Sequence, residues 1–200
     1  MGKYKVIDGN EACAHISYMF TEIAGIYPIT PASPMSEYID KWSTEGRLNL
    51  FNNKVKLIEM QSEAGAIALV HGSLQTGSLA STYTASQGLL LMIPSMYKIA
   101  GEMLPCVINV ASRTVATHAL SIFGDHSDIY ASRSTGFCFL ASSSVEDTIY
   151  MTLASYLSTL KGKLPFVNFF DGFRTSHELN KVYVPDMSEI KGLVPFKTIA

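Results

Sequence analysis

Two glutamates, Glu59 and Glu63, lie on either side of a short turn in a stretch that is otherwise rich in apolar and small residues. The pattern predicts the end of a buried strand, the turn, and a helix that begins at Glu63. Charged side chains are rarely buried without a partner. The residues alone leave two explanations open. Glu63 is either a helix N-terminal carboxylate, stabilised by free backbone N–H groups and the helix dipole, or a carboxyl in an apolar cleft that exchanges a proton with a ligand.

Two further polar residues come directly after predicted buried strands. Thr30 follows a strand predicted over residues 25–29, and Arg113 follows one predicted over residues 105–111. In open parallel sheets, ligands bind outside the carboxyl ends of the strands. Thr30 also fits an ordinary loop position. Arg113 is either a surface residue or an anion hook, because a guanidinium can grip a carboxylate through two parallel hydrogen bonds.

The elements that would position these side chains follow from the hydrophobic pattern. Apolar stretches of strand length alternate with segments of helical periodicity about five or six times. Strands that are apolar throughout are typical of a parallel sheet with helices on both faces. The sequence therefore predicts an α/β domain built on such a sheet, with Thr30, Glu63 and Arg113 along one edge. We predict strands over 3–7, 25–29, 55–60, 79–84, 105–111, 136–141 and 165–170. We predict helices over about 9–22, 34–44, 89–102 and 144–161, and one that begins at residue 63 and ends between residues 72 and 77.

Local signals mark some of the element ends. Asp8 or Asn10 could cap the first helix, and Ser86 could cap the helix predicted over 89–102. His15 lies on the first helix, and we expect a structural role for it. After residue 178 the pattern weakens. We therefore predict a domain over 1–180, followed by a linker over 181–200 that leads toward further domains.

The composition limits the classes of function. A chain of 200 residues with 48% hydrophobic residues is long enough for one substantial core. The net charge of −2, with acids and bases mixed along the chain, gives no electrostatic case for binding nucleic acid or an anionic membrane. Charged residues make up only 16%, which indicates either a large core or a surface that other protein covers. The longest apolar run, residues 88–96, is too short to span a bilayer.

The three cysteines, Cys13, Cys106 and Cys138, are far apart in the sequence and form no CxxC motif. We therefore expect no disulfide framework, zinc site or iron–sulfur ligation within the chain, and a reducing, cytoplasmic compartment. The histidines and aspartates of residues 118–128 have no helical metal-ligand spacing, so we expect no metal site there. Glycine-rich phosphate motifs are absent.

Five segments closely resemble motifs of the 2-oxoacid:ferredoxin oxidoreductases. They are YPITPASP at 27–34, EMQSEAGA at 59–66, TYTASQGLLLM at 82–92, HALSIFGDH at 118–126 and FFDGFRTSHE at 169–178. Together they are similar to the amino-terminal domain of pyruvate:ferredoxin (or flavodoxin) oxidoreductases, from about residue 9 to residue 185. Pro34 is a departure, since the family more often has a small polar residue there, and we expect it to be tolerated.

The resemblance implies the pyrimidine-binding domain of thiamine diphosphate enzymes. On this basis Glu63 hydrogen-bonds a ring nitrogen of the cofactor's aminopyrimidine and so promotes removal of the proton from the thiazolium carbon. Thr30 and Arg113 resemble the pair that holds the carboxylate and carbonyl of the substrate. Such a two-point grip would orient the bond that breaks.

The resemblance also implies a larger enzyme that decarboxylates pyruvate oxidatively to acetyl-CoA and passes electrons to ferredoxin or flavodoxin. Other domains would bind the diphosphate through Mg²⁺, carry iron–sulfur clusters and bind coenzyme A, and the complete enzyme would be a homodimer. This chain alone is then expected to be inactive. Two alternatives remain: the same domain in an enzyme for another 2-oxoacid, and a non-catalytic interaction module of that fold.

Overall fold

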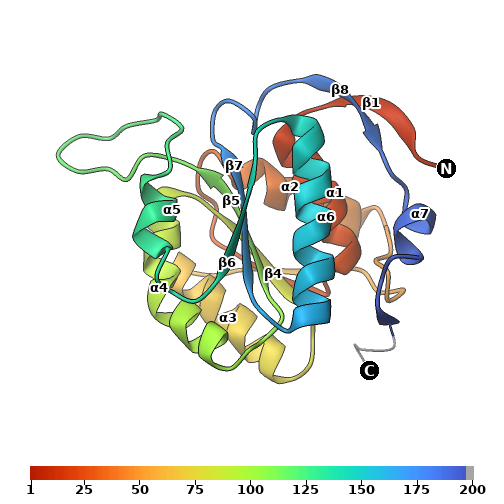
Figure 1. The fold of residues 1–200 in the computed structure, drawn as a ribbon, viewed down its shortest axis with the longest axis horizontal. Helices are drawn as coiled ribbons and strands as arrows, with labels where there is room; N and C mark the ends of the chain where they lie inside the picture. Colours follow the sequence, from red (N-terminus) through yellow and green to blue (C-terminus); the bar gives the residue numbers. More distant parts are fainter. Residues whose placement is uncertain (197–200) are drawn as a thin grey trace.

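The computed structural model describes residues 1–196 of the chain, which fold around one central sheet (Figure 1). In chain order the elements are β1 (Lys3–Ile7), α1 (Gly9–Phe20), β2 (Ile23–Ile26), α2 (Ser33–Thr44), β3 (Lys56–Glu59), α3 (Glu63–Gln75), β4 (Ala80–Thr84), α4 (Ser86–Gly101), β5 (Val107–Ser112), α5 (Ser127–Ser132), β6 (Cys138–Ser142), α6 (Val145–Gly162), β7 (Phe166–Asp171), β8 (Asn180–Val184) and α7 (Met187–Lys191).

The central sheet has six strands in the order β3-β2-β4-β5-β7-β6. All of its pairings are parallel. Every residue of β4 and β5 is buried, which explains why neither strand contains a charged residue. From β2 the chain runs outward to β3 and then returns across β2 to β4, so the winding direction reverses between β2 and β4. Sites in doubly wound folds form at the carboxyl ends of strands beside such a reversal.

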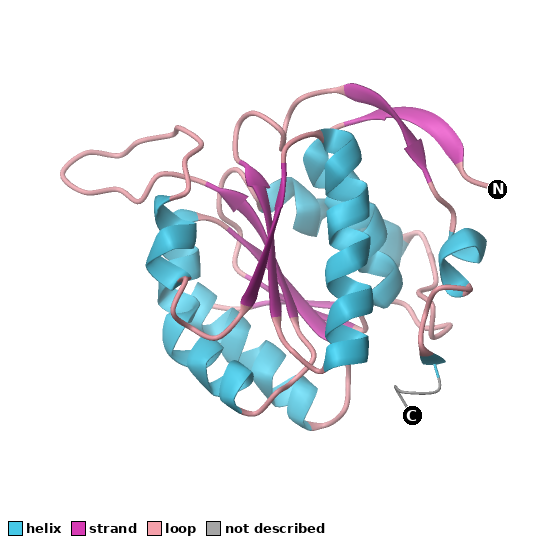
Figure 2. Ribbon diagram, in the orientation of Figure 1, coloured by secondary structure: helices cyan, strands magenta, loops and turns pink. Residues whose placement is uncertain are grey.

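Helices cover both faces of this sheet (Figure 2). Helices α3, α4 and α5 lie on one face, where Leu89 packs in a core with Ile108. Helices α1 and α6 lie on the other face, where Ile16 and Ile149 pack with Val107, and α2 extends this layer over β2. The predicted α/β fold, a parallel sheet flanked by helices on both faces, is thus confirmed.

The end of the chain differs from the linker that we predicted over 181–200. Strand β8 pairs antiparallel with β1, from Lys3 opposite Val184 onward, and α7 follows it. Val182, Val184 and Ile190 pack into the same core cluster as the residues of α1 and α6. The linker prediction is therefore wrong for the described part of this segment, and residues 197–200 lie outside the described residues. The signal was missed because only alternate residues of the short strand β8 are buried, and its partner lies at the other end of the chain.

The predicted caps are confirmed in one case and wrong in another. Asp8 is the N-cap of α1, and its side chain accepts a hydrogen bond from the backbone N–H of Glu11. Ser86 does not cap α4. The N-cap is Ala85, without a side-chain hydrogen bond, and Ser86 is the first helical residue with a φ of +49°. The helix therefore begins three residues earlier than predicted, inside the turn that follows β4.

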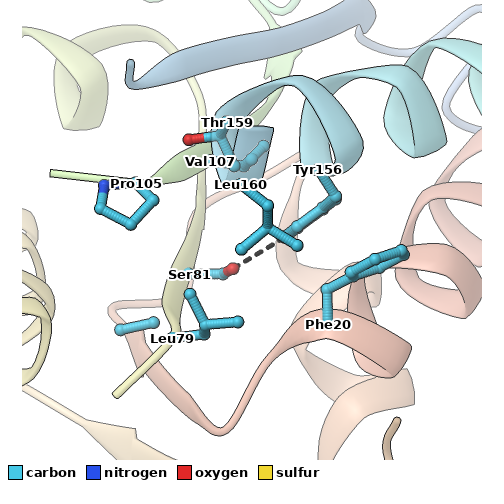
Figure 3. Close-up of a pocket in the computed structure, with 9 residues that line it drawn as sticks. Phe20, Leu79, Ser81, Pro105, Val107, Tyr156, Thr159 and Leu160 are labelled. Atoms are coloured by element: carbon cyan, nitrogen blue, oxygen red, sulfur yellow. Dashed lines mark hydrogen bonds between the residues drawn. The ribbon is translucent and has the colours of Figure 1, made fainter. Parts of the chain in front are cut away.

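A small cavity of about 10 Å³ lies between the amino ends of β4 and β5 and the end of α6 (Figure 3). Its wall includes Ser81 and Tyr156, whose hydroxyl oxygens are 2.7 Å apart and hydrogen-bonded. This volume matches a single water molecule. The cavity is therefore too small for an organic ligand, and it lies at the opposite end of the sheet from the carboxyl ends of the strands. None of the helices formed by residues 1–196 combines the length and apolar character needed to cross a bilayer.

His15 connects α1 to the C-terminal segment and provides a pH-dependent contribution to stability. Its Nε2 donates to the backbone oxygen of Pro185 at 2.8 Å, and its own backbone oxygen accepts from Arg47 at 3.1 Å. Burial, and then the charge of Arg47, lower the pKa of His15 to about 4. Between about pH 6.5 and pH 4 the unfolded chain therefore takes up a proton that the folded chain does not.

We expect the free energy of unfolding to fall as the pH drops through this window. The loss attributable to His15 is about 2 kcal/mol, since one pKa unit corresponds to about 1.4 kcal/mol and the side chain is only half-buried. Urea unfolding at several pH values, compared between the natural chain and His15→Gln, isolates this contribution. Parallel pH profiles of the two proteins would contradict it.

Candidate functional site

The three residues singled out from the sequence gather at the carboxyl edge of the sheet. Thr30 lies in the loop after β2, Glu63 begins α3 after β3, and Arg113 follows β5 directly. The side chain of Asn10, at the start of α1, donates to the backbone oxygen of Pro31 at 3.0 Å and so holds the Thr30 loop against the sheet. Arg113 Nη1 donates to the backbone oxygen of Thr30 at 2.6 Å. The contact between these two residues thus uses the Thr30 carbonyl. The Thr30 side chain is exposed, and its hydroxyl has no partner among residues 1–196.

Glu63 is a buried carboxylate that the helix cap does not need. The N-cap of α3 is Ser62, whose side chain accepts from the backbone N–H of Gly65. Glu63 is only 6% exposed, and within residues 1–196 its carboxylate has no hydrogen-bond partner. Burying an unpartnered carboxylate is costly. Its position is therefore better explained by a ligand that supplies a hydrogen-bond donor than by helix capping. Glu59, by contrast, is exposed at the end of β3.

The turn after β4 approaches Glu63 closely, and only glycine fits there. A Cβ built on Gly88 would lie 2.8 Å from Cγ and 2.9 Å from Oε1 of Glu63, and 2.4 Å from Oγ1 of Thr84. The absent side chain allows the glutamate to lie against this turn. The buried Thr84 hydroxyl has no hydrogen-bond partner in the described part of the chain. Two polar groups thus converge at Gly88 without satisfying each other.

Ser86, in the same turn, adopts a left-handed conformation that is unusual for a residue other than glycine. It is fully buried, and its backbone N–H donates to Oδ2 of Asp128 at 2.8 Å. The same carboxylate oxygen accepts from the backbone N–H of Arg113 at 3.1 Å. One buried carboxylate thus ties together the carboxyl ends of β4 and β5 and holds the strained turn in place. Burial raises the pKa of Asp128, and its backbone hydrogen bonds from Arg113, Ser86 and Ile129 act in the opposite direction.

Arg113 brings a positive charge into this edge of the sheet. It is 9% exposed, and its Nη2 donates to Oε1 of Gln87 at 2.9 Å. Burial lowers the pKa of Arg113, while the charges of Asp128 and Glu63 oppose this shift. No carboxylate of residues 1–196 lies within ion-pair distance of the guanidinium, and Nε has no partner there. The group thus keeps a positive charge that no carboxylate of the described residues neutralises by direct contact, although its Nε is buried from solvent.

The segment after Arg113 forms a loop that projects from the sheet edge, drawn in green at the upper left of Figure 1. Its neck is closed by a hydrogen bond from the backbone N–H of Thr114 to the oxygen of Phe123, at 3.0 Å. Leu120, Ile122 and Phe123 are exposed along this loop. His126 Nε2 lies 2.8 Å from Oδ1 of Asp171 at its base.

The described chain holds no group of three or more histidine, cysteine or acidic side chains arranged to bind a metal ion.

Gln87 and Asp128 were missed as site residues by the sequence analysis. Asp128 belonged to a segment considered for metal binding, and Gln87 to the family motif at 82–92, but neither residue was given a role. The available signal was the sequence Ala-Ser-Gln-Gly directly after a buried strand, which predicts a close backbone approach. What Asp128 contacts could not be predicted, because its partners come from two other loops.

Fold and site together define a ligand-binding domain of the doubly wound α/β class, with a buried carboxylate and a guanidinium at the switch point. Comparison with known proteins identifies the family. The model of the thiamine diphosphate-binding domain of pyruvate flavodoxin/ferredoxin oxidoreductases matches residues 16–198. The chain therefore belongs to this family, as the sequence motifs indicated.

The chain has several relatives of high identity. It is 56% identical over 195 residues to pyruvate:ferredoxin oxidoreductase of Moorella thermoacetica, covering 98% of this chain and 17% of that protein. It is 54% identical over 199 residues to pyruvate-flavodoxin oxidoreductase of Enterobacter agglomerans, covering 100% and 17%. It is also 51% identical over 199 residues to pyruvate dehydrogenase [NADP(+)] of Cryptosporidium parvum, covering 100% and 10%. The chain thus spans only a small part of the length of these relatives.

One solved structure shows the same fold. It is 2-oxoglutarate:ferredoxin oxidoreductase from Magnetococcus marinus, with 2-oxoglutarate, coenzyme A and succinyl-CoA bound. The match has a TM-score of 0.80 at 21% identity and covers 93% of this chain and 32% of that one. At this identity the likeness supports the fold assignment alone.

Proposed function

We propose that this chain provides the pyrimidine side of the active site in an enzyme that oxidatively decarboxylates pyruvate to acetyl-CoA. The observation that carries the proposal is the Glu63 carboxylate, buried and unpartnered against Gly88. Electrons would pass to ferredoxin or flavodoxin. The names of the relatives favour pyruvate as the substrate.

The site residues fit thiamine diphosphate. Glu63 would accept a hydrogen bond from the ring nitrogen of the aminopyrimidine and hold the proton that this ring must gain and lose. Gly88 leaves the space in which Glu63 lies close to the turn. When bound, the cofactor supplies the carbon nucleophile and the electron sink for decarboxylation. Since the chain has no glycine-rich phosphate loop, we assign the diphosphate and its Mg²⁺ to another domain.

Thr30 and Arg113 are proposed to hold the substrate. No carboxylate of the described residues is paired with the charge of the guanidinium, so it suits the carboxylate of a small 2-oxoacid. The exposed Thr30 hydroxyl is close enough in the fold to contact the same molecule, since Arg113 bonds the Thr30 carbonyl. Holding the substrate at two points would fix the bond to be cleaved relative to the cofactor.

The remaining parts of the reaction are assigned to protein outside this chain. They comprise iron–sulfur clusters, a site for coenzyme A and the contact with the electron acceptor. Relatives of similar identity carry names with ferredoxin, flavodoxin or NADP(+), so we infer that the acceptor is not determined by this domain. A homodimeric enzyme is proposed from the family resemblance, and the free cysteines favour a reducing, cytoplasmic location.

Two alternative functions differ from this one, the first in its substrate and the second in having no chemistry. The same fold occurs in an enzyme named for 2-oxoglutarate, so another 2-oxoacid is the nearest alternative. A non-catalytic interaction module of this fold is the other. The presence of Glu63, Thr30 and Arg113 together at one sheet edge argues against a module that has lost its chemistry.

A calorimetric titration with thiamine diphosphate and Mg²⁺ tests the proposal. The chain is titrated alone and then mixed with a candidate diphosphate-binding domain. We expect heat of binding only in the mixture, and weaker binding when the chain carries Glu63→Gln. Binding to the chain alone would mean that it holds a diphosphate site of its own. Absence of binding in the mixture, with both parts folded by circular dichroism, would favour the interaction module.

A further inference from the structure

We propose that Gln87 positions the Arg113 guanidinium with a neutral hydrogen-bond acceptor, so that the positive charge stays available for the carboxylate of the substrate. The inference rests on the proposed function, because it assigns a role within the same site. It adds a residue that neither the motif comparison nor the sequence analysis assigned. It also explains why a glutamine, rather than a glutamate, lies beside a buried arginine.

The contacts of Gln87 are short and converge on one oxygen. Gln87 lies in the first turn of α4, and its Oε1 accepts from Arg113 Nη2 at 2.9 Å and from Ser86 Oγ at 2.5 Å. On the other side of the guanidinium, Nη1 donates to the Thr30 carbonyl at 2.6 Å. The guanidinium is thus held at two nitrogens, and both acceptors are uncharged. Its orientation is fixed before any substrate arrives.

The nearby carboxylates are kept away from the guanidinium. Asp128 Oδ2 accepts from two backbone N–H groups, those of Ser86 and Arg113, and Oδ1 accepts from the N–H of Ile129. Glu63 influences Arg113 only through its charge, without a contact. Among residues 1–196 the buried guanidinium therefore has no ion-pair partner. A protein carboxylate paired with Arg113 would compete with the substrate, because both carboxylates would bind the guanidinium through two parallel N–H donors.

A glutamate at position 87 separates this proposal from a purely structural role. Glutamate has nearly the same shape as glutamine and keeps the acceptor oxygen, so a structural role predicts that Gln87→Glu is tolerated. In our proposal the added charge pairs with Arg113 and displaces the substrate carboxylate. A second variant, Gln87→Met, keeps the length of the side chain but removes the acceptor and adds no charge.

The test uses the complete enzyme that contains this domain, with two measurements on each variant. The first is the KM and kcat for pyruvate. The second is calorimetric binding of oxamate, an unreactive analogue of pyruvate, which needs no turnover. We expect Gln87→Glu to raise the KM and the oxamate dissociation constant by about 30-fold or more, the size expected when a charge-assisted hydrogen bond is lost. Gln87→Met should raise both by about three- to tenfold, through looser positioning alone.

The relative effects of Gln87→Glu and Gln87→Met on binding distinguish the proposed role of Gln87 from a purely structural one. Weaker binding in Gln87→Glu than in Gln87→Met, at equal or higher thermal stability, supports the proposal. Natural KM and oxamate affinity in Gln87→Glu would overturn it. Arg113→Ala serves as the reference for the site itself. If Arg113→Ala leaves oxamate binding unchanged, the substrate-binding role that the proposed function gives to Arg113 is wrong. If Arg113→Ala weakens binding and Gln87→Glu does not, only the role of Gln87 is wrong.

Discussion

Replacing Glu63 with glutamine in the complete enzyme should lower turnover by a factor on the order of 10²–10⁴, the range for loss of a positioned acid–base group. The substitution preserves the size of the side chain, so the packing against Gly88 should remain. What is lost is the ability to accept and hold a proton at a carboxylate oxygen. We expect the loss to appear in kcat and in cofactor affinity, with the thermal midpoint unchanged or higher, since an unpartnered buried charge is removed.

Glu59 provides a matched control in the same stretch. It is exposed at the end of β3, four residues before Glu63, so Glu59→Gln makes the same chemical change away from the site. We expect natural turnover and cofactor affinity for Glu59→Gln. Natural turnover in Glu63→Gln, measured at saturating thiamine diphosphate, would contradict the assignment of Glu63 as the carboxylate that contacts the cofactor.

Replacing Gly88 with alanine should lower turnover by displacing the Glu63 side chain, whereas Glu63→Gln changes its chemistry. The added methyl group would lie 2.4 Å from Oγ1 of Thr84 and 2.8 Å from Cγ of Glu63, closer than any real Cβ contact. Thr84 belongs to a fully buried strand, so the displacement should fall mainly on the glutamate side chain. We expect the free energy of unfolding to decrease by about 1–3 kcal/mol, the usual cost of overpacking. We also expect a loss of turnover larger than this modest destabilisation explains.

Gly72→Ala is a matched control for Gly88→Ala. It lies in α3, the helix that Glu63 begins, and a Cβ there would meet no atom within 4 Å. Gly72→Ala should therefore stabilise the protein by about 0.5–1 kcal/mol, as expected for glycine to alanine in a helix, and leave turnover unchanged. Urea unfolding and steady-state kinetics on both variants separate packing from chemistry. Natural kinetics in Gly88→Ala would show that Glu63 has more room than the structure gives it.

The sequence alone determined the layered α/β fold and three polar positions at one sheet edge. This succeeded because the signals are local. Strands such as β4 and β5 contain no charged residue along their whole length, since both of their faces are covered by helices. The position of Glu63 at the start of a helix was likewise visible from the small and apolar residues that follow it. In a parallel sheet, the carboxyl ends of strands share an edge, so residues just past those ends come together.

The tertiary structure alone decided which groups touch. The pairing of β1 with β8 joins the two ends of the chain and turned a predicted linker into part of the core. The left-handed Ser86 is bonded to Asp128, which comes from the first turn of α5. The neutral contacts of Arg113 depend on the relative placement of the turns after β2 and β4. Contacts of this kind combine residues distant in sequence, and no local periodicity encodes them, because they arise only when the sheet has brought its strand ends together.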